Sequence, residues 1–385
     1  MNILIAPNSM KGSLSAFDFA NTVEEALLHY SPKVKIRKVP VADGGDFTGE
    51  VLAKALNAKT TNITVRGPLG DKVNSKYFVS GKTAIIEMAD ASGMKLVDRG
   101  KLNPLKASSY GTGELIADAI QKGCKNILLA VGGTATVDGG MGMMQALGYQ
   151  FFDEKGNELS GNGFNLGRVI GFPAPKKIPG ISFKIISDVD NPLLGVNGAA
   201  EIFGPQKGAT PEMVVQLEKG LKNWSQIFRR KTGKFIAEKP GTGAAGGIAI
   251  PLVSVFKAEI VPGADFILSK INFDVHVKWA NLVITGEGCI DSQTMNNKAP
   301  FAVAQWAKKQ NKPVFAIGGK VENIATTAFD HIFSITSDTM DTDFGMINAR
   351  QLLFDFTLRL APIILKPKPS LFDYEHFKLL ESRKV

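Results

Sequence analysis

Asn281-Leu-Val-Ile-Thr285 runs directly into Gly286-Glu287-Gly288-Cys289-Ile290-Asp291. The first part is an apolar run typical of a buried strand, and the second reads as an acidic loop punctuated by glycines. In an open α/β sheet, ligands bind outside the carboxyl ends of the strands. Glycine lets the backbone approach a ligand closely, and two carboxylates can hold a metal ion or a hydroxyl group. The stretch therefore predicts an α/β fold with a ligand site at a strand exit.

Four other strand exits share this design. Apolar runs at residues 3–7, 38–42, 127–131 and 185–186 lead into Asn8-Ser-Met-Lys-Gly-Ser13, Asp43-Gly-Gly-Asp46, Gly132-Gly-Thr-Ala-Thr-Val-Asp-Gly-Gly140 and Ser187-Asp-Val-Asp-Asn-Pro192. Together the five exits carry glycines, hydroxyls, carboxylates and one lysine. Such a set predicts an active site for a phosphorylated ligand with Mg²⁺.

The order of the expected elements indicates two domains. Strand and helix patterns alternate over residues 2–56, which is typical of a parallel sheet, and Ser15 is placed to cap the first helix. Residues 61–88 alternate polar and apolar side chains between turns, which predicts antiparallel hairpins. The αβ alternation returns from residue 281. We therefore expect a Rossmann-like α/β domain at 1–60 plus 275–385, interrupted by a mixed α/β domain at 61–274.

Composition limits the function classes. The 385 residues are 44% hydrophobic with a net charge of +9, and they contain no run of 18 apolar residues. The first strand begins almost at Met1 and only two cysteines occur, so we expect a cytoplasmic protein without a signal peptide or membrane partner. The basic residues form no tract interleaved with aromatics, which disfavours nucleic acid. A positive field would recruit small anionic substrates.

The first two exits suit substrate binding and catalysis. Lys11, flanked by Ser9 and Ser13, suits a phosphate or carboxylate, although an exposed lysine beside a capping serine would look the same. Asp46 can be explained as a helix cap, whereas Asp43 before Gly44 cannot, so Asp43 is the better site candidate.

The other exits suit a nucleotide and a metal ion. The loop with Gly132, Gly133, Thr134, Asp138, Gly139 and Gly140 leads into an expected helix at 141–147, whose N-terminus could cradle phosphate; a tight turn is the alternative. Asp188 and Asp190 would share a side of an extended chain and could hold Mg²⁺ or take a hydroxyl proton. An Asx-turn before Pro192 would also explain them.

Six blocks of the sequence are similar to the bacterial type I glycerate kinases. They are Ala6-Pro-Asn-Ser-Met-Lys-Gly-Ser-Leu-Ser-Ala16, Ala42-Asp-Gly-Gly45, Ser109-Tyr-Gly-Thr-Gly-Glu-Leu115, Ser187-Asp-Val-Asp-Asn-Pro-Leu-Leu-Gly195, Phe203-Gly-Pro-Gln-Lys-Gly-Ala209 and Ile284-Thr-Gly-Glu-Gly-Cys-Ile-Asp-Ser-Gln-Thr294. The resemblance spans residues 1–365. It implies phosphorylation of D-glycerate with ATP and Mg²⁺, typically to 2-phosphoglycerate, in a cleft between two α/β domains.

The resemblance also guides the roles that we expect. Catalysis is assigned to Lys11, Asp43 and Asp188; substrate binding to Ser9, Ser13, Gly44, Asn191 and Thr285; ATP binding to Gly132, Gly133, Thr134, Asp138, Gly139 and Gly140; and Mg²⁺ binding to some of Asp188, Asp190, Glu287 and Asp291. Lys11 would neutralise the transferred phosphoryl group or the substrate carboxylate. Asp43 or Asp188 would deprotonate the attacking hydroxyl.

Four positions depart from the usual pattern of that family. Asn8 stands for Asp, Met10 for Phe, Val137 for Asn and Cys289 for Arg. Two alternatives therefore stay open. The chain could phosphorylate another small hydroxy acid or sugar acid, or it could be a non-catalytic sensor or nucleic-acid-binding derivative. A homodimer also stays open.

Overall fold

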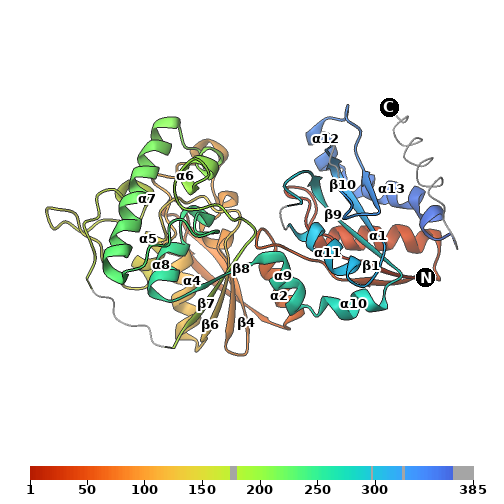
Figure 1. Ribbon diagram of the computed structural model, residues 1–385, viewed down its shortest axis with the longest axis horizontal. Coiled ribbons are helices and arrows are strands. Elements are labelled where there is room, and N and C mark those ends of the chain that lie inside the picture. The colour runs from red at the N-terminus through yellow and green to blue at the C-terminus, as the bar shows by residue number, and fades with distance from the viewer. Residues whose placement is uncertain (174–179, 296–297, 323–325, 367–385) are drawn as a thin grey trace. The chain divides into compact units, whose positions relative to one another are not determined.

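The computed structural model describes residues 1–173, 180–295, 298–322 and 326–366. The chain divides into two compact units (Figure 1). Unit 1 comprises Met1–Asp43 and Gly263–Val385, and unit 2 comprises Gly44–Pro262. Unit 1 is thus assembled from both ends of the chain, and unit 2 is the inserted segment.

Unit 1 is built on a parallel sheet. Its strands are β1 (Asn2–Ile5), β2 (Lys35–Lys38), β9 (Leu282–Ile290), β10 (Val314–Val321) and β11 (His331–Ser334). Their order is β11-β10-β9-β1-β2, and every neighbouring pair is parallel. The parallel α/β domain expected from the sequence is confirmed.

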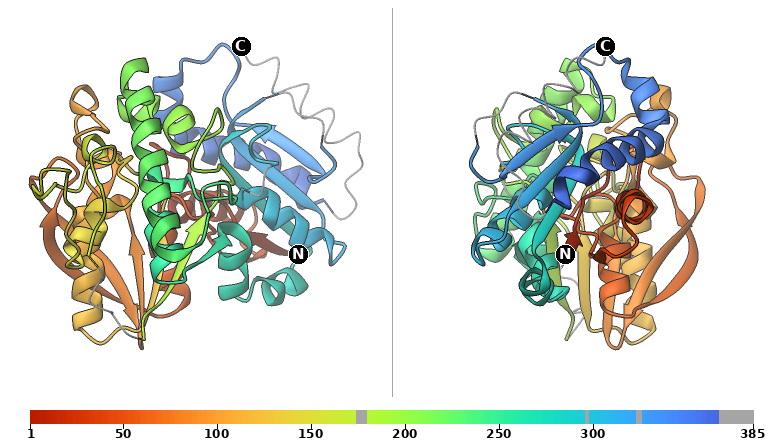
Figure 2. Two further views of the ribbon diagram at one scale, coloured as in Figure 1. Left: turned by 60° about the vertical axis from the view of Figure 1, so that its left-hand side comes forward. Right: turned by 90° about the vertical axis from the view of Figure 1, so that its right-hand side faces the viewer.

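Helices cover both faces of this sheet because successive strand residues point to opposite sides. Ile3 and Ile5 pack with α1 (Ala16–Tyr30) and α13 (Ala349–Ile364), which lie side by side in Figure 2. Leu4 packs on the other face among residues of α9 (Gly263–Lys270), α10 (Phe273–Trp279) and α11 (Ala299–Lys308). Ser15 caps α1 by accepting a hydrogen bond of 3.0 Å from the Asp18 N–H, as predicted. A short helix, α12 (Thr342–Ile347), precedes α13.

Unit 2 contains a mixed sheet. Its strands are β3 (Lys59–Arg66), β4 (Lys72–Ser80), β5 (Thr83–Glu87), β6 (Asn126–Ala130), β7 (Ser182–Ser187) and β8 (Glu259–Pro262), in that spatial order. The pairs β3–β4 and β4–β5 are antiparallel, which confirms the predicted hairpins. From β5 to β8 the strands are parallel.

The core of unit 2 joins one sheet face to several helices. Trp224 of α7 (Pro211–Thr232) is fully buried against Phe151, Phe172 and Phe228. The helix α2 packs against β4 and β5. The helices of unit 2 besides α7 are α2 (Thr48–Ala55), α3 (Ala89–Ser92), α4 (Tyr110–Gln121), α5 (Met141–Ala146), α6 (Ala199–Phe203) and α8 (Ala249–Val255), with 3-10 turns at Met94–Leu96, Arg99–Lys101, Gly163–Asn165, Pro205–Lys207 and Ala244–Gly246.

The unit boundaries differ from the expected ones. The helix α2 belongs to unit 2 because it packs on β4 and β5, whereas α9 belongs to unit 1 because it packs on α11. The short elements β8, α9 and α10 were not predicted. Among the described residues, no helix combines the length and apolarity needed to cross a membrane.

The stretch after residue 285 was predicted to be a loop, and this was wrong. The strand β9 continues to Ile290, which pairs with Val321 of β10. Gly286 does not end the strand. Its missing side chain lets β9 approach its neighbours, since a Cβ there would lie 2.1 Å from the Ile317 carbonyl oxygen and 2.7 Å from Phe19 Cζ.

Gly286→Ala is therefore expected to lower the free energy of unfolding by about 1–3 kcal/mol, because the new methyl group would overpack a fixed backbone and a buried ring. Gly288→Ala, in the same strand, is the matched control. Its Cβ would meet no atom closer than 3.4 Å. Urea denaturation of both variants checks the comparison, and equal stabilities would contradict it.

Candidate active site

The polar residues that follow β1 and β2 lie at one edge of the sheet of unit 1, beside the part of β9 that extends past β1, because these strands run parallel. Asn8, Asp43 and Glu287 lie there, only 4%, 3% and 7% exposed. Burying polar groups is costly unless each finds a partner. The contacts of these three side chains therefore define the candidate site.

Asp43 is held by two donors from different segments. The Asn8 side-chain amide donates to Asp43 Oδ2 at 2.8 Å, and the Ala299 N–H donates to the same oxygen at 3.4 Å. Ala299 is the first residue of α11, so the carboxylate also meets the positive end of a ten-residue helix. Asn8 is itself fixed, because its N–H donates to the Gly286 carbonyl and its side-chain oxygen accepts from the Ser9 N–H at 2.8 Å.

Glu287 lies close to a second carboxylate. The Thr294 hydroxyl is 2.7 Å from Glu287 Oε1 and 3.4 Å from Asp291 Oδ1. Lys298 forms an ion pair with Asp291 at 3.9 Å. Burial raises the pKa of Glu287 to about 7; the Thr294 hydrogen bond and Lys298 oppose this shift, while Asp43 and Asp291 add to it. This edge of unit 1 thus gathers acidic oxygens that repel one another.

The loop after β1 places Lys11 at the surface. Gly12, with a φ of 75°, turns the chain, and Met10 N–H bonds to the Leu14 carbonyl. The Ser13 hydroxyl donates to the Met346 carbonyl of α12 at 2.6 Å. Lys11 is therefore accessible to a ligand, whereas the Ser13 hydroxyl fastens the loop to α12.

Two predicted substrate-binding residues are buried inside unit 1. Thr285 is fully buried and its hydroxyl donates to the Ala6 carbonyl at 2.8 Å, which ties β9 to the end of β1. Ser9, which belongs to the loop after β1, is only 3% exposed. The geometry supports a structural part for both residues rather than contact with a substrate.

In unit 2, the loop at residues 131–140 surrounds an anionic group of the protein itself, the Asp138 carboxylate. The Asp138 carboxylate is fully buried and accepts hydrogen bonds from Ser109 N–H, Ser109 Oγ, Gly140 N–H and Gly142 N–H at 2.7, 2.7, 3.0 and 3.2 Å. Burial raises the pKa of Asp138, and these bonds oppose the shift. The helix α5 has only six residues, and Asp138 with Ser109 occupies its first N–H groups. The predicted phosphate cradle at this helix start is not supported, because its donors are used internally.

The glycines of this loop make room for protein rather than for a ligand. A Cβ on Gly132 would lie 2.5 Å from Gly45 Cα, and one on Gly139 would lie 2.5 Å from Trp224 Cδ1. Gly140 packs in the same way against Pro251. Only Gly132 and Gly133 are half-exposed; Thr134 and residues 135–140 are buried. Any ligand of this loop therefore meets the backbone at Gly132 and Gly133, beside Gly44 and Asp46.

The chain bends at Asp188, directly after β7. The Ser187 hydroxyl accepts from the Val189 N–H at 3.3 Å, so the chain does not stay extended as the predicted pairing of Asp188 with Asp190 required. Asp188 is half-buried and Asp190 is exposed. The Asn191 side chain donates to the Asn197 carbonyl at 2.8 Å, which uses its amide within the loop.

Lys207 and Glu87 are buried charged residues near the strand exits of unit 2 that sequence reasoning missed. Lys207 is 3% exposed, and its Nζ donates to Thr134 Oγ1 at 3.1 Å and to the Thr136 carbonyl at 2.7 Å. Glu87 at the end of β5 is 5% exposed and accepts from the N–H groups of Phe47 and Gly49 at the start of α2. The signal for Glu87 was its place at a strand exit. Lys207 lies in one of the six blocks that carry the family resemblance, but lysine is so rarely buried that its residue type did not indicate a place inside unit 2.

Within the described part of the chain, no three His, Cys, Asp or Glu residues are grouped so as to hold a metal ion. Of the four predicted ligands, Glu287 and Asp291 belong to unit 1 and Asp188 and Asp190 to unit 2. Glu287 and Asp291 share the Thr294 hydroxyl and are the pair brought together.

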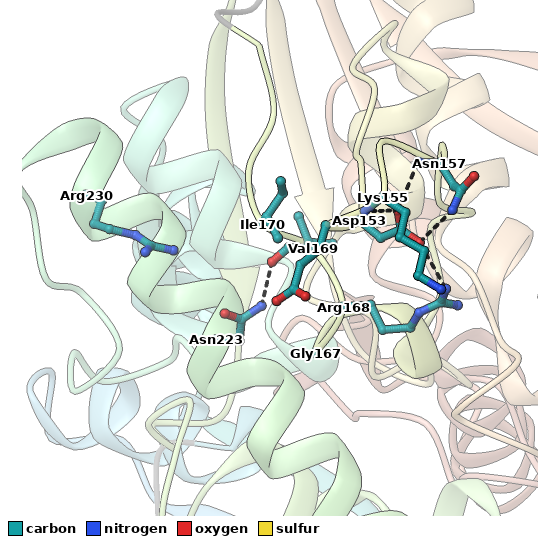
Figure 3. Close-up of a pocket in the computed structure, with 10 residues that line it drawn as sticks. Asp153, Lys155, Asn157, Gly167, Arg168, Val169, Ile170, Asn223 and Arg230 are labelled. Carbon is teal, nitrogen blue, oxygen red and sulfur yellow. Dashed lines mark hydrogen bonds and ion pairs between the residues drawn. The ribbon is translucent and has the colours of Figure 1, made fainter.

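A surface pocket of about 610 Å³ in unit 2 contains none of the predicted site residues (Figure 3). Its lining includes an ion pair of 3.2 Å between Arg168 and Asp153, and Asn223, which donates to the Val169 carbonyl at 2.9 Å. Asp153, Arg168 and Asn223 therefore already have partners within the lining of the pocket.

Comparisons with known proteins agree on one family. The family model described as "Glycerate kinase family" matches residues 3–365. A glycerate kinase of Halalkalibacterium halodurans is 40% identical over 94% of this chain and 97% of its own, and the glycerate 2-kinase of Escherichia coli K12 is 40% identical over 89% and 93%. A crystal structure from Salmonella typhimurium LT2, provisionally described as glycerate kinase 2, is 37% identical with a TM-score of 0.79, covering 94% of this chain and 98% of that one.

Glu87 should make stability depend on pH. Burial, with the charge of Asp90, raises its pKa from the usual 4.5 to about 7; Lys95 and the hydrogen bonds from Gly49 and Phe47 oppose this shift. The folded state then binds more protons than the unfolded state between these values, so the unfolding free energy falls as pH rises from about 4.5 to 7 and levels off above.

The Glu87→Gln variant should lack this pH dependence of the unfolding free energy. For wild type it amounts to at most about 1.4 kcal/mol per pH unit between pH 4.5 and 7. Urea denaturation of wild type and variant at several pH values between 5 and 8 measures the difference. Other titrating groups cancel in that difference when they are distant. Parallel stability curves for the two proteins would show that Glu87 does not carry the effect.

Proposed function

The chain belongs to the glycerate kinase family, and we propose that it transfers the γ-phosphoryl group of ATP to D-glycerate, with Mg²⁺, to give 2-phosphoglycerate. The E. coli relative is named a glycerate 2-kinase, which favours this product. Two free cysteines, Cys124 and Cys289, favour a reducing compartment such as the cytoplasm.

One observation carries the proposal: a buried carboxylate, Asp43, is held at a strand exit by two N–H donors from different segments of unit 1. Such a carboxylate is fixed in position and can accept the proton of an attacking hydroxyl group. We therefore assign Asp43 as the base that orients and deprotonates a hydroxyl of D-glycerate. Asp188 in unit 2 is the alternative base.

Lys11 supplies the positive charge. It lies on the surface of the loop that begins with Asn8, whose side chain bonds Asp43. Phosphoryl transfer depends mainly on positioning and on neutralising negative charge. In this assignment Lys11 binds either the transferred phosphoryl group or the glycerate carboxylate.

The Glu287 and Asp291 carboxylates fit Mg²⁺. Magnesium prefers oxygen ligands, and in phosphoryl-transfer sites it takes one or two carboxylates together with phosphate oxygens and water, so a cluster of three protein ligands is not required. The raised pKa of Glu287 reflects burial and the neighbouring charges of Asp43 and Asp291, which a cation would relieve. When bound, Mg²⁺ neutralises phosphate charge. Asp188 and Asp190 are further candidates in unit 2.

In unit 2, the half-exposed backbone of Gly132 and Gly133 is the part of its loop that we assign to ATP. Asp138, Gly139 and Gly140 shape this loop from within, as their burial and packing indicate. We thus narrow the predicted ATP contacts to the exposed part of the loop.

A coupled assay with purified protein, ATP, Mg²⁺ and D-glycerate tests the proposal, with the product position read by phosphorus NMR. A panel of other small hydroxy acids and sugar acids tests the alternative substrates. Turnover of another acid at a kcat/KM well above that of D-glycerate would replace the proposed substrate. No turnover of any acid would reject the kinase activity.

Asp43→Asn should lower kcat by about 100-fold or more, because loss of a positioned base typically costs that much. The size of the side chain is kept, so the thermal unfolding temperature should change little. Asp343→Asn, an exposed residue of α12, serves as the control. Steady-state kinetics and thermal unfolding of both variants decide the matter; a kcat close to wild type for Asp43→Asn would transfer the role of base to Asp188.

Lys11→Ala should lower kcat/KM by at least about 100-fold, since removing one group that stabilises transition-state charge costs about that much. Stability should be nearly unchanged because Lys11 is exposed. Lys33→Ala, an exposed lysine between α1 and β2, is the matched control. Near-wild-type turnover by folded Lys11→Ala protein would refute the assignment.

A further inference from the structure

Lys207 is a buried lysine that none of the assignments above uses. It ends the 3-10 turn Pro205–Lys207, which follows α6 in unit 2. Its ammonium reaches the loop at residues 131–140 and donates to Thr134 Oγ1 at 3.1 Å and to the Thr136 carbonyl at 2.7 Å. With the residue only 3% exposed, it contacts the inner side of the loop.

The turn that carries Lys207 is itself fixed. Gly204 and Gly208 flank it, and a Cβ on either would lie 2.3 Å from a backbone carbonyl oxygen, that of Ala200 or Leu102. The Lys207 N–H bonds to the Gly204 carbonyl, and the Gly208 N–H to the Pro205 carbonyl. The ammonium is therefore presented from a rigid backbone rather than from a movable surface side chain.

Backbone hydrogen bonds also hold the residues of the loop that neighbour Thr134. Thr134 forms a backbone bridge with Gly93, and the adjacent Gly133 carbonyl accepts from the Met94 N–H at 2.9 Å. The Gly132 N–H donates to the Gly44 carbonyl at 3.0 Å. Because Thr134 directly follows these two half-exposed glycines, a shift of Thr134 would change their backbone and strain both of these bonds.

A buried lysine carries an energetic cost at this position. Burial lowers the pKa of Lys207 to about 7, with the nearby Asp138 opposing the shift. Its two hydrogen bonds to the loop offset part of this cost. A methionine would fill the same space without the desolvation cost, but it would leave Thr134 Oγ1 and the Thr136 carbonyl without this donor, and the loop would lose both links to the rigid turn.

We propose that Lys207 is a positioning residue of the phosphoryl-transfer site: from inside unit 2 it holds Thr134 and Thr136 and thereby sets the backbone of Gly132 and Gly133. This inference rests on the proposed function, because the two glycines are the assigned contact with ATP. Lys207 acts through the loop and does not touch the substrates.

Lys207→Met tests the proposal, with Lys219→Met, an exposed lysine of α7, as the matched control. A misplaced group in a phosphoryl-transfer site can cost about 100-fold in rate, so kcat of Lys207→Met should fall about 10- to 100-fold. The KM for D-glycerate should stay within about threefold of wild type, because Asp43, which orients the hydroxyl of the acid in our assignment, belongs to unit 1. Thermal stability should change by no more than the loss of two buried hydrogen bonds explains. Lys219→Met should match wild type.

Amide hydrogen exchange gives a readout that does not depend on turnover. Exchange in peptides covering residues 131–137 should be faster in Lys207→Met than in wild type, while β3 peptides exchange alike. If wild-type protein does not phosphorylate D-glycerate, the proposed function fails, yet the exchange experiment still decides whether Lys207 positions the loop.

Two results would overturn the proposal. One is Lys207→Met protein with the kcat and loop exchange of Lys219→Met. The other is a loss of activity that only tracks a loss of folded protein. Should Lys207→Met fail to fold, Thr134→Val removes one acceptor of the ammonium and keeps the shape of the side chain. It should lower kcat and speed loop exchange in the same direction, and unchanged values for both would equally reject the inference.

Discussion

The strand exits of this protein depend on one constraint: each buried carboxylate must be satisfied by N–H or hydroxyl donors. Asp138 accepts two hydrogen bonds from Ser109 and two from the N–H groups of Gly140 and Gly142. Glu87 accepts hydrogen bonds from the N–H groups of Phe47 and Gly49. Asp43 accepts them from the Asn8 side-chain amide and the Ala299 N–H. Because an unsatisfied buried charge is very costly, each carboxylate locks the backbone that surrounds it.

This constraint separates two kinds of acidic residue. The carboxylate oxygens of Asp138 and Glu87 accept hydrogen bonds from the backbone of unit 2 and hold its loops in place. Asp43 and Glu287 instead lie in an acidic neighbourhood at the sheet edge of unit 1, where each adds to the negative charge around the other. Chemistry that needs a proton acceptor or an oxygen ligand is therefore better placed in unit 1, while unit 2 offers preformed backbone.

The sequence predicted the sheets well because their signals are local. Apolar runs and strand alternation repeat over a few residues, and the hairpins of residues 61–88 show both. Glycine was less informative. A glycine at a strand exit can admit a ligand or a neighbouring backbone, and the sequence does not distinguish them: Gly132 and Gly139 admit Gly45 and Trp224. The burial of Lys207 could not be predicted for a related reason, since burial depends on which distant segment covers a residue.

The four departures from the family pattern differ in physical weight. Met10 and Val137 are buried in hydrophobic clusters and act through packing. Cys289 is half-buried in β9, where burial and the neighbouring acids Asp291, Glu322 and Glu287 raise its pKa and favour the neutral thiol. Unlike arginine, a thiol supplies no positive charge to this acidic edge. Asn8 has the largest chemical consequence. Its amide donates to Asp43 at 2.8 Å, whereas an aspartate at position 8 would place a second carboxylate against Asp43 and offer it no such donor. The neutral amide fixes Asp43 without adding a second negative charge beside it. The change at position 8 is therefore compatible with Asp43 acting as a base.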